Sequence, residues 1–399
     1  MSTPSCVAMI TSVFYPSIGG AQRVVLDTAR QLRARGVEVL VVTRHHRGLA
    51  RYEEVRGLPT YRVGWGDAGK ALAAISFILG ALWLLWRLRR RYDVLHCHQM
   101  ISPMTIGLLA RALFRCPLVV MPHGSGDFGD VSLLTRRRPL TGRLRLAAAA
   151  RLADAFVCIS PAIRAELLSV GMPAARLWDI ANGVDLEHFR PVTPDQRRAL
   201  RSALGLPDGP LAIYAGRLSP EKGVDVLLAA WPATLQQVPD ARLLLVGSGA
   251  QQAALEEQAR RLGVAERVIF AGGCDDVAPF LQAADLFVLP SYSEGLPVAL
   301  LEALACGLPC VATSTDGAAQ VLQDGLTGRL VPPGDPAALA RALAEALTAP
   351  DLRVWGERGR SHVARQYALE DVVGRYLAMY RAVSPAFAAA PPAALQRDR

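Results

Sequence analysis

The segment DLFVLPSYSEGLPVALLEALACGLPCVAT, residues 285–313, predicts a strand, a helix and a second strand in close succession. DLFVLP and PCVAT are short apolar runs typical of buried strands. VALLEALA predicts a helix that begins at Pro297, because proline is favoured at the first helical position. Strand–helix–strand units of this kind build parallel sheets, so the segment indicates an α/β fold.

Glu302 is the one charged residue of this predicted helix. Val298 and Leu301 lie on one side of a helical wheel and Leu300 and Leu304 on the other, so the helix is apolar all round and should be buried. A buried carboxylate is costly unless other groups satisfy it. We therefore expect Glu302 to hold a binding partner.

Similar apolar runs alternate with helical patterns along the whole chain. The predicted strands lie at 6–14, 37–44, 93–98, 117–123, 155–160, 211–216, 241–247, 267–272, 285–290 and 309–313. This alternation predicts two Rossmann-like doubly wound parallel-sheet domains.

The domain boundary is expected in the segment 190–210, which is rich in proline and charge. The predicted domains are therefore 1–190 and 191–369. A last helix follows at 370–385, and the Ala/Pro-rich residues 386–399 are expected to be a disordered tail.

Charge is unevenly distributed between the two halves. Residues 1–190 contain 25 Lys and Arg against 13 Asp and Glu, a net charge of +12, whereas residues 191–399 contain 19 against 22, a net charge of −3. A basic half indicates an anionic partner. No nucleic-acid-binding module accompanies these residues, so we expect a membrane surface or a phosphorylated substrate and no nucleic acid.

The predicted location is cytoplasmic. The seven cysteines form no C-x-x-C pair, and the N-terminal residues lack the charged region and cleavage site of a secretory signal.

One predicted helix, ALAAISFILGALWLLW at 71–86, contains no charge and is followed by RLRRR. It is slightly shorter than the roughly 17–25 residues of a spanning helix. Two interpretations stay open: a helix buried against its own sheet, or an interfacial helix that places the protein peripherally on the inner face of an anionic membrane.

Two predicted strand-to-helix turns could bind phosphate groups. Gly19 and Gly20 follow the first strand, where glycine lets a backbone approach a ligand closely. Arg217 and Lys222 flank the turn after the strand at 211–216, and two cations there suit a diphosphate. The alternative is a solvated surface pair, with Glu221 as the carboxylate.

Other nucleotide and metal sites are disfavoured. Gly247-x-Gly249 begins like a dinucleotide fingerprint, but Gln252 occupies the third glycine position. There is no P-loop and no D-x-D pair. Alternation along the strand at 93–98 points Cys97 away from His96 and His98, which favours a structural role over a zinc site. We expect no metal and no cofactor.

Together, the GG loop, DVLHCH, the HG at 123–124, NGVD at 182–185, the G-R-x-x-x-x-K-G loop and E-x7-E resemble the family-4 retaining glycosyltransferases of the GT-B fold. The resemblance spans nearly the whole chain. It implies a GT-B architecture, in which two Rossmann-like domains enclose an interdomain cleft and a terminal helix crosses back to the N-terminal domain.

The resemblance also implies roles for individual residues. Glu302 would accept hydrogen bonds from the ribose hydroxyls of the nucleotide. Glu294 would face the hydroxyls of the transferred sugar, and His123 would lie against that sugar. The diphosphate would be held by Arg217, Lys222 and the backbone from Gly295 to Val298. The remaining donor-binding residues implied are Gly19, Gly20, Gly247, Leu296 and Pro297.

The expected function is retaining, metal-independent transfer of a hexosyl group from a nucleoside-diphosphate sugar to an acceptor hydroxyl. The acceptor would be a glycan or a lipid-linked, membrane-proximal molecule in envelope polysaccharide or glycolipid synthesis. Two alternatives are a nucleotide-sugar epimerase of the same fold and a non-catalytic nucleotide-sugar-binding scaffold. Gln22 and Gln320 stand where the family usually has glutamate, which affects the expected donor more than the reaction type.

Overall fold

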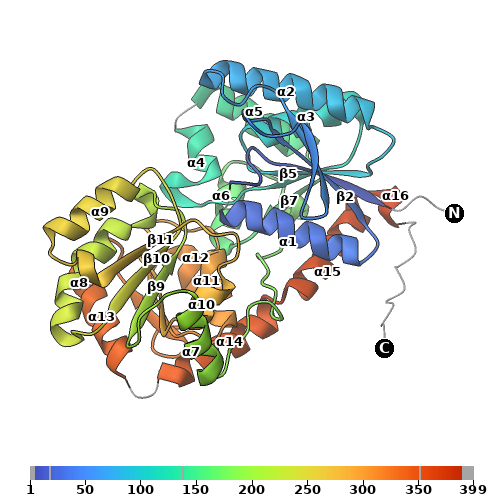
Figure 1. Ribbon diagram of the computed structural model, residues 1–399. Coiled ribbons are helices and arrows are strands. Elements are labelled where there is room, and N and C mark those ends of the chain that lie inside the picture. Colours follow the sequence, from blue (N-terminus) through green and yellow to red (C-terminus); the bar gives the residue numbers. More distant parts are fainter. Residues whose placement is uncertain (1–4, 18, 137–138, 350–351, 389–399) are drawn as a thin grey trace. The chain divides into compact units, whose positions relative to one another are not determined.

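The computed structural model describes residues 5–17, 19–136, 139–349 and 352–388, and the chain divides into two compact units (Figure 1). The first unit comprises Met1–Ser17, Ala21–Asn182 and Leu369–Arg399; the second comprises Ile18–Gly20 and Gly183–Ala368. Each unit is built around its own sheet.

The first sheet has eight strands in the order β3-β4-β2-β1-β5-β6-β7-β8. All pairings are parallel except the one between β3 and β4. The strands are β1 Cys6–Ile10, β2 Glu38–Arg44, β3 Tyr52–Val55, β4 Leu58–Val63, β5 Val94–His98, β6 Leu118–Met121, β7 Ala155–Cys158 and β8 Leu177–Asp179.

The second sheet has six strands in the order β11-β10-β9-β12-β13-β14, all parallel. They are β9 Leu211–Ala215, β10 Arg242–Val246, β11 Val268–Gly272, β12 Leu286–Leu289, β13 Cys310–Thr313 and β14 Gly328–Val331. The predicted α/β fold with two doubly wound, essentially parallel sheets is confirmed.

Four strands lie outside the predicted set: β3, β4, β8 and β14. β3 and β4 form a hairpin whose two turn residues, Arg56 and Gly57, have φ of 51° and 83°. Positive φ at both positions suits the twist of a tight hairpin. β3 is largely exposed, so it lacks the continuous apolar run by which the buried strands are recognised.

In both sheets the strand order reverses beside the strand that comes first in the chain. β1 lies between β2 and β5, and β9 lies between β10 and β12. Loops that leave the carboxyl ends of two such strands diverge to opposite faces, and ligands of doubly wound sheets bind in the crevice between them. The loops after β9 and β12 carry the predicted Arg217, Lys222 and Glu294.

Helices connect the strands of both units. The first unit contains α1 Gly20–Ala34, α2 Lys70–Arg87, α3 Ser102–Phe114, α4 Asp130–Thr135, α5 Pro139–Leu152, α6 Pro161–Ser169, α15 Leu369–Val383 and α16 Pro385–Ala388. The second contains α7 Pro194–Ala203, α8 Val224–Gln237, α9 Gln252–Arg261, α10 Ala278–Ala283, α11 Val298–Ala305, α12 Asp316–Val321, α13 Pro336–Thr348 and α14 Leu352–Gln366.

The chain end returns to the first unit through α15. Tyr380 of α15 is fully buried, and its hydroxyl lies 2.7 Å from Nδ1 of His96 on β5. Residues 386–388 were expected to be disordered, but they belong to α16. Phe387 orders this segment, because its side chain is buried and its ring centre lies 5.3 Å from that of Tyr380. Residues 389–399 lie outside the described part of the chain.

The apolar helix α2 is buried on one side only. Phe77 and Ala81 face the sheet, whereas five large side chains point to solvent and form what we call the apolar stripe of α2: Leu72, Ile75, Leu79, Trp83 and Trp86. Their exposed fractions run from 49% for Leu72 to 63% for Leu79. Among the described residues α2 is the one helix long and apolar enough to cross a membrane by length and composition, and 28% of it is buried.

Gly356 in α14 is required by close packing against the end of α11. A Cβ on Gly356 would lie 2.0 Å from the carbonyl oxygen of Gly307, a backbone atom that cannot turn away. Gly374 in α15 is a matched helical glycine with room, since the nearest atom to its Cβ would be Nη1 of Arg35 at 3.8 Å.

We expect Gly356→Ala to lower the free energy of unfolding by about 1–3 kcal/mol through overpacking. Gly374→Ala should instead raise it by up to about 1 kcal/mol, the ordinary helix-propensity gain of alanine over glycine. Urea denaturation measures both. Equal stabilisation by the two substitutions would contradict the close packing of α14 on α11.

Candidate functional site

Arg217 and Lys222 lie in the loop that leaves the carboxyl end of β9, and Glu294 lies in the loop that leaves the neighbouring strand β12. The first loop ends in a short 3₁₀ turn, Pro220–Lys222, directly before α8. Because β9 and β12 are adjacent, residues far apart in the chain meet where the strand order of the sheet reverses, which we call the switch point.

The backbones of the two loops are fixed to each other. The amide N–H of Tyr292 donates to the carbonyl of Glu221 at 2.9 Å. Gly223 has φ of 62°, and a Cβ there would lie 2.2 Å from the carbonyl oxygen of Pro290. Only glycine satisfies both the left-handed conformation and this close approach.

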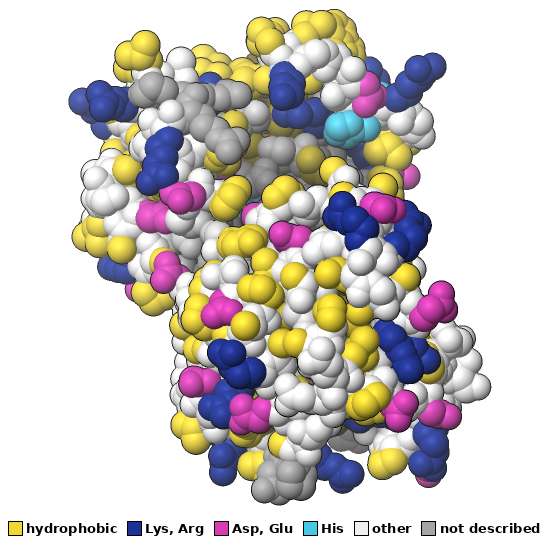
Figure 2. Space-filling model, turned by 90° about the vertical axis from the view of Figure 1, so that its left-hand side faces the viewer, with side chains coloured by type: hydrophobic (Ala, Val, Ile, Leu, Met, Phe, Trp, Pro, Cys, Tyr) yellow, Lys and Arg dark blue, Asp and Glu magenta, His cyan; other side chains and the backbone are white. Residues whose placement is uncertain are grey.

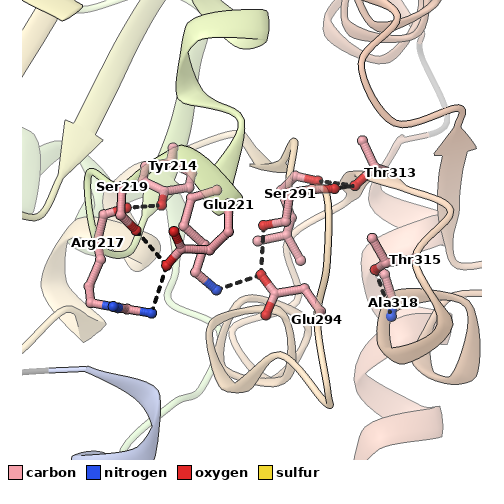
Figure 3. A network of polar contacts seen from close by, with 11 residues as sticks. Tyr214, Arg217, Ser219, Glu221, Ser291, Glu294, Thr313, Thr315 and Ala318 are labelled. Atoms are coloured by element: carbon pink, nitrogen blue, oxygen red, sulfur yellow. Dashed lines mark hydrogen bonds and ion pairs between the residues drawn. The ribbon is translucent and has the colours of Figure 1, made fainter. Parts of the chain in front are cut away.

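Lys222 and Glu294 form an ion pair across the two loops (Figure 3). Nζ of Lys222 lies 2.8 Å from Oε1 of Glu294, and the Ser291 hydroxyl donates to the same oxygen at 2.6 Å. The side chains of Lys222 and Glu294 are only 19% and 9% exposed. Such a shielded pair depends on further hydrogen bonds to offset desolvation, and Ser291 supplies one of them.

Arg217 is paired more loosely. Nη2 of Arg217 donates to Oε1 of Glu221 at 2.9 Å, but the Arg217 side chain is 58% exposed. Burial alone would raise the pKa of Glu221, yet the hydrogen bond from Ser219 and the charges of Arg217 and Lys222 bring that pKa below its usual value. The pairing of Arg217 with Glu221 matches the alternative of a surface pair raised from the sequence, and the exposed guanidinium can still turn towards a ligand.

Two inner contacts support this loop. The hydroxyl of the buried Tyr214 donates to the carbonyl of Arg217 at 2.7 Å. Gly247, after β10, has φ of 144°, and a Cβ there would lie 1.8 Å from the carbonyl of Gly216. Gly247 therefore lets the loops after β9 and β10 pack backbone to backbone, which is a structural reason for the glycine.

Glu302 is buried on α11, as the sequence predicts, with 6% of its surface exposed. Glu302 is not without a partner within the chain. Burial and, second to it, the charge of Glu302 together raise the pKa of the nearby Cys306 thiol to about 12. α11 begins at Val298, with Pro297 at its N-cap position, and Gly295 and Leu296 are buried before it.

In the first unit, His123 follows β6 and lies beside His98 of β5. Nδ1 of His98 is 3.1 Å from Nε2 of His123, and the ring of His96 stacks on that of His98 with centroids 4.3 Å apart. The predicted common orientation of His96 and His98 is therefore confirmed. Burial lowers the pKa of His96 to about 3 and that of His123 to about 4, and it holds the pKa of His98 well below its ordinary value.

The remaining predicted residues occupy ordinary positions. Gly19 directly precedes α1, which begins at Gly20, and the Gln22 amide donates to the carbonyl of Val13 at 3.2 Å. Gln320 lies on α12, where its backbone carbonyl accepts a hydrogen bond from the Tyr367 hydroxyl at 3.4 Å. Within the described residues, no group of three or more His, Cys, Asp or Glu side chains is arranged to hold a metal ion.

Three contributors to the second-unit site were not identified from the sequence: Tyr214, Ser219 and Ser291. Ser219 and Ser291 each follow soon after the carboxyl end of a central strand. That position is a signal shared by many serines, and only the contacts with Glu221 and Glu294 reveal their role.

Comparisons with known proteins cover both units. The family profile described as "Glycosyl transferases group 1" matches residues 196–362, and the one described as "Glycosyltransferase Family 4" matches residues 18–188. The chain is 32% identical over 362 residues to D-inositol 3-phosphate glycosyltransferase of Streptomyces scabiei, covering 84% of this chain and 80% of that protein.

Two further similarities extend this result. GDP-mannose-dependent alpha-(1-6)-phosphatidylinositol monomannoside mannosyltransferase of Mycolicibacterium smegmatis is 36% identical over 207 residues, covering 50% of this chain and 54% of that protein. The solved structure of sucrose-phosphate synthase from Thermosynechococcus elongatus has a TM-score of 0.80 at 26% identity, covering 97% of this chain and 100% of that chain.

The buried histidines make stability depend on pH. An unfolded histidine titrates near pH 6.5, whereas folded His123 titrates near 4, so between these values the unfolded state binds a proton that the folded state does not. The free energy of unfolding should therefore fall as the pH is lowered from 6.5 to 4, by up to about 1.4 kcal/mol per pH unit for each such histidine.

Urea denaturation at constant ionic strength across this pH range measures the slope. His123→Gln should reduce this slope by the contribution of one histidine, because the variant lacks one of the groups whose pKa is lowered on folding. His188→Gln is the control, since the side chain of His188 is 43% exposed and pairs with Asp276 at the surface. An unchanged slope in His123→Gln would contradict a His123 that stays neutral in the folded state down to about pH 4.

Proposed function

Because the chain belongs to glycosyltransferase family 4 of the group 1 glycosyltransferases, we propose that it transfers a hexosyl group from a nucleoside-diphosphate sugar to an acceptor hydroxyl, with retention of anomeric configuration. The relative from Mycolicibacterium smegmatis is described as GDP-mannose-dependent, which supports a nucleotide sugar as donor.

The observation that carries this proposal is that two cations, Arg217 and Lys222, lie in the loop at the switch point between β9 and β12. An ammonium has three N–H donors, and in the described structure one of those of Lys222 goes to Glu294. Lys222 can therefore bind a phosphate oxygen while it keeps its ion pair with Glu294. Arg217, exposed and joined to Glu221, can turn its planar guanidinium to a second phosphate group.

In the proposed reaction the acceptor oxygen attacks the anomeric carbon on the face that the diphosphate leaves. The bond between that carbon and the β-phosphate oxygen breaks, and the acceptor proton passes to the departing diphosphate. Lys222 and Arg217 stabilise the negative charge that develops there. Lys222 and Ser291 orient Glu294, which accepts hydrogen bonds from hydroxyl groups of the sugar. Glu302 accepts hydrogen bonds from the hydroxyl groups of the ribose.

We propose that His123 of the first unit acts on the transferred sugar as a neutral group. Its pKa of about 4 keeps the imidazole uncharged near neutral pH, so it can form a hydrogen bond to the sugar without adding positive charge.

We expect activity to survive chelation of divalent metal, because side-chain cations take the role of a metal ion. Lys222→Met or Arg217→Met should lower turnover by about 10²–10³, as for removal of a charge-stabilising donor in the transition state. Arg260→Met, which breaks the exposed pair with Glu257 on α9, is the matched control and should change turnover little.

The assay combines UDP-, GDP- and ADP-sugars with candidate acceptors, with and without EDTA, and follows the anomeric proton of the product by NMR. Loss of turnover in EDTA that Mg²⁺ or Mn²⁺ restores would refute the metal-independent site. An isomerised sugar formed from donor alone would indicate an epimerase, and an inverted product would refute retention.

We further propose that the acceptor is lipid-linked or membrane-proximal and that the first unit docks on the cytoplasmic face of an anionic membrane. The apolar stripe of α2 supports this, together with α3 and α5, which lie in series beside α2 and also expose leucines. The exposed leucines of these two helices are Leu109, Leu113, Leu140, Leu144 and Leu152. Figure 2 shows hydrophobic side chains gathered at the top of the view, where α2 lies in Figure 1.

Cations border this surface. The Arg87 guanidinium lies 5.6 Å from the ring centre of Trp83, and that of Arg89 lies 5.0 Å from Trp86. Tryptophan beside arginine is typical of a membrane–water boundary. The sequence also clusters arginines at 136–138, 143 and 145 in the same unit, and these cations would assist binding to an anionic surface. Arg136 is joined to Asp127 and Arg143 is exposed, whereas residues 137–138 lie outside the described part of the chain.

Co-sedimentation with liposomes tests this docking. Binding should require anionic lipid and weaken at high salt, since each arginine near the surface contributes about 1 kcal/mol. The double substitution Leu79→Gln/Trp83→Gln should reduce binding more than tenfold, because each large apolar side chain contributes about 1.5–3 kcal/mol when buried. Leu326→Gln, at an exposed leucine of the second unit, is the control. Absence of binding, or binding that ignores lipid charge, would refute the docking and leave the transferase assignment intact.

A further inference from the structure

Three histidine rings lie in series in the first unit. His96 and His98 come from β5, and their rings stack with centroids 4.3 Å apart; the rings of His98 and His123 stack at 5.3 Å. His96 and His98 are fully buried. Nδ1 of His98 and Nε2 of His123 are 3.1 Å apart, so one of these nitrogens donates a hydrogen bond to the other.

The surroundings of His98 decide the direction of that bond. Its other nitrogen, Nε2, is buried and has no hydrogen-bond partner among the described residues. With the proton on Nε2, a buried N–H donor would be left unpaired; with the proton on Nδ1, only a lone pair is left unpaired. Orphaned N–H donors are the rarer and costlier case in proteins. His98 is therefore the donor, through Nδ1–H, and His123 accepts at Nε2.

This direction fixes the tautomer of His123. A neutral imidazole carries one proton, and a ring that accepts at Nε2 must carry that proton on Nδ1. The backbone is held as well, because the carboxylate of Asp130 accepts the amide N–H of His123 at 2.9 Å and that of Met100 at 3.0 Å. The half-buried His123 thus presents Nδ1–H as its remaining polar edge.

We propose that His98 is a positioning residue, which holds His123 in the Nδ1-protonated tautomer so that His123 meets the transferred sugar as a hydrogen-bond donor. This inference rests on the proposed function, which places His123 beside that sugar. His98 itself touches no substrate and acts only through the ring of His123. Its own ring is held by the stack with His96, whose Nδ1 lies 2.7 Å from the Tyr380 hydroxyl.

The test compares His98→Asn with His98→Leu, two side chains of nearly equal shape. The Asn amide places an N–H close to the former Nδ1 and can still donate to His123, whereas Leu cannot. His98→Leu should lower kcat/KM by about tenfold, the effect of one lost hydrogen bond. His98→Asn should restore most of it. Equal losses in both variants would overturn the proposal.

The second readout is NMR of protein labelled with ¹⁵N in its histidine rings, with the His123 signals identified by their loss in His123→Gln. In the unmodified protein Nδ1 of His123 should have the shift of a protonated nitrogen and Nε2 that of an acceptor. His98→Leu should move the proton to Nε2, and His98→Asn should leave it on Nδ1.

A proton on Nε2 of His123 in the unmodified protein would overturn the proposal, and this measurement needs no variant to fold. An unchanged tautomer in a folded His98→Leu would overturn it as well. Absence of transfer with every donor would refute the proposed function alone, since the NMR readout decides the tautomer without turnover.

Discussion

The ion pair between Lys222 and Glu294 is the interaction around which the second-unit site is organised. It joins loops from two adjacent strands at the point where the sheet reverses its order. A shielded pair is stabilising only if its geometry is fixed and its remaining hydrogen bonds are made. The bond from Tyr292 to Glu221, the glycine at 223 and the Ser291 hydroxyl meet these conditions, so the backbone of both loops serves to hold one lysine and one glutamate in place.

The two units use different chemistry at corresponding positions. In the second unit the loops at the switch point carry paired charges. In the first unit the strand beside the switch point carries His96 and His98, which hold the ring of His123, and burial lowers the pKa of all three so that they are neutral near pH 7. A transfer reaction that releases a diphosphate needs fixed positive charge at the leaving group, whereas neutral donors can orient a sugar without strengthening ground-state binding of the phosphates. The division of charge between the units is consistent with that requirement.

Helix α2 shows how a tertiary fold can leave apolar surface unused. Its sequence is apolar all round, yet the sheet covers only the side that carries Phe77 and Ala81. Exposed apolar surface on this scale on a folded unit marks a site of interaction more often than a defect. The arginines that stack on Trp83 and Trp86 make the border of that surface cationic.

The sequence by itself determined the α/β class, most of the strands and the positions of Arg217, Lys222, Glu294 and Glu302 after strands or on a buried helix, because burial and periodicity are local properties. Only the tertiary structure decided the exposed hairpin of β3 and β4 and the bond between Lys222 and Glu294, which are 72 residues apart. It also decided that His98 faces His123 and that α2 keeps a face in solvent. The physical reason is that these contacts depend on which strands become neighbours and which helix side the sheet covers, and neither is encoded in the local pattern of residues.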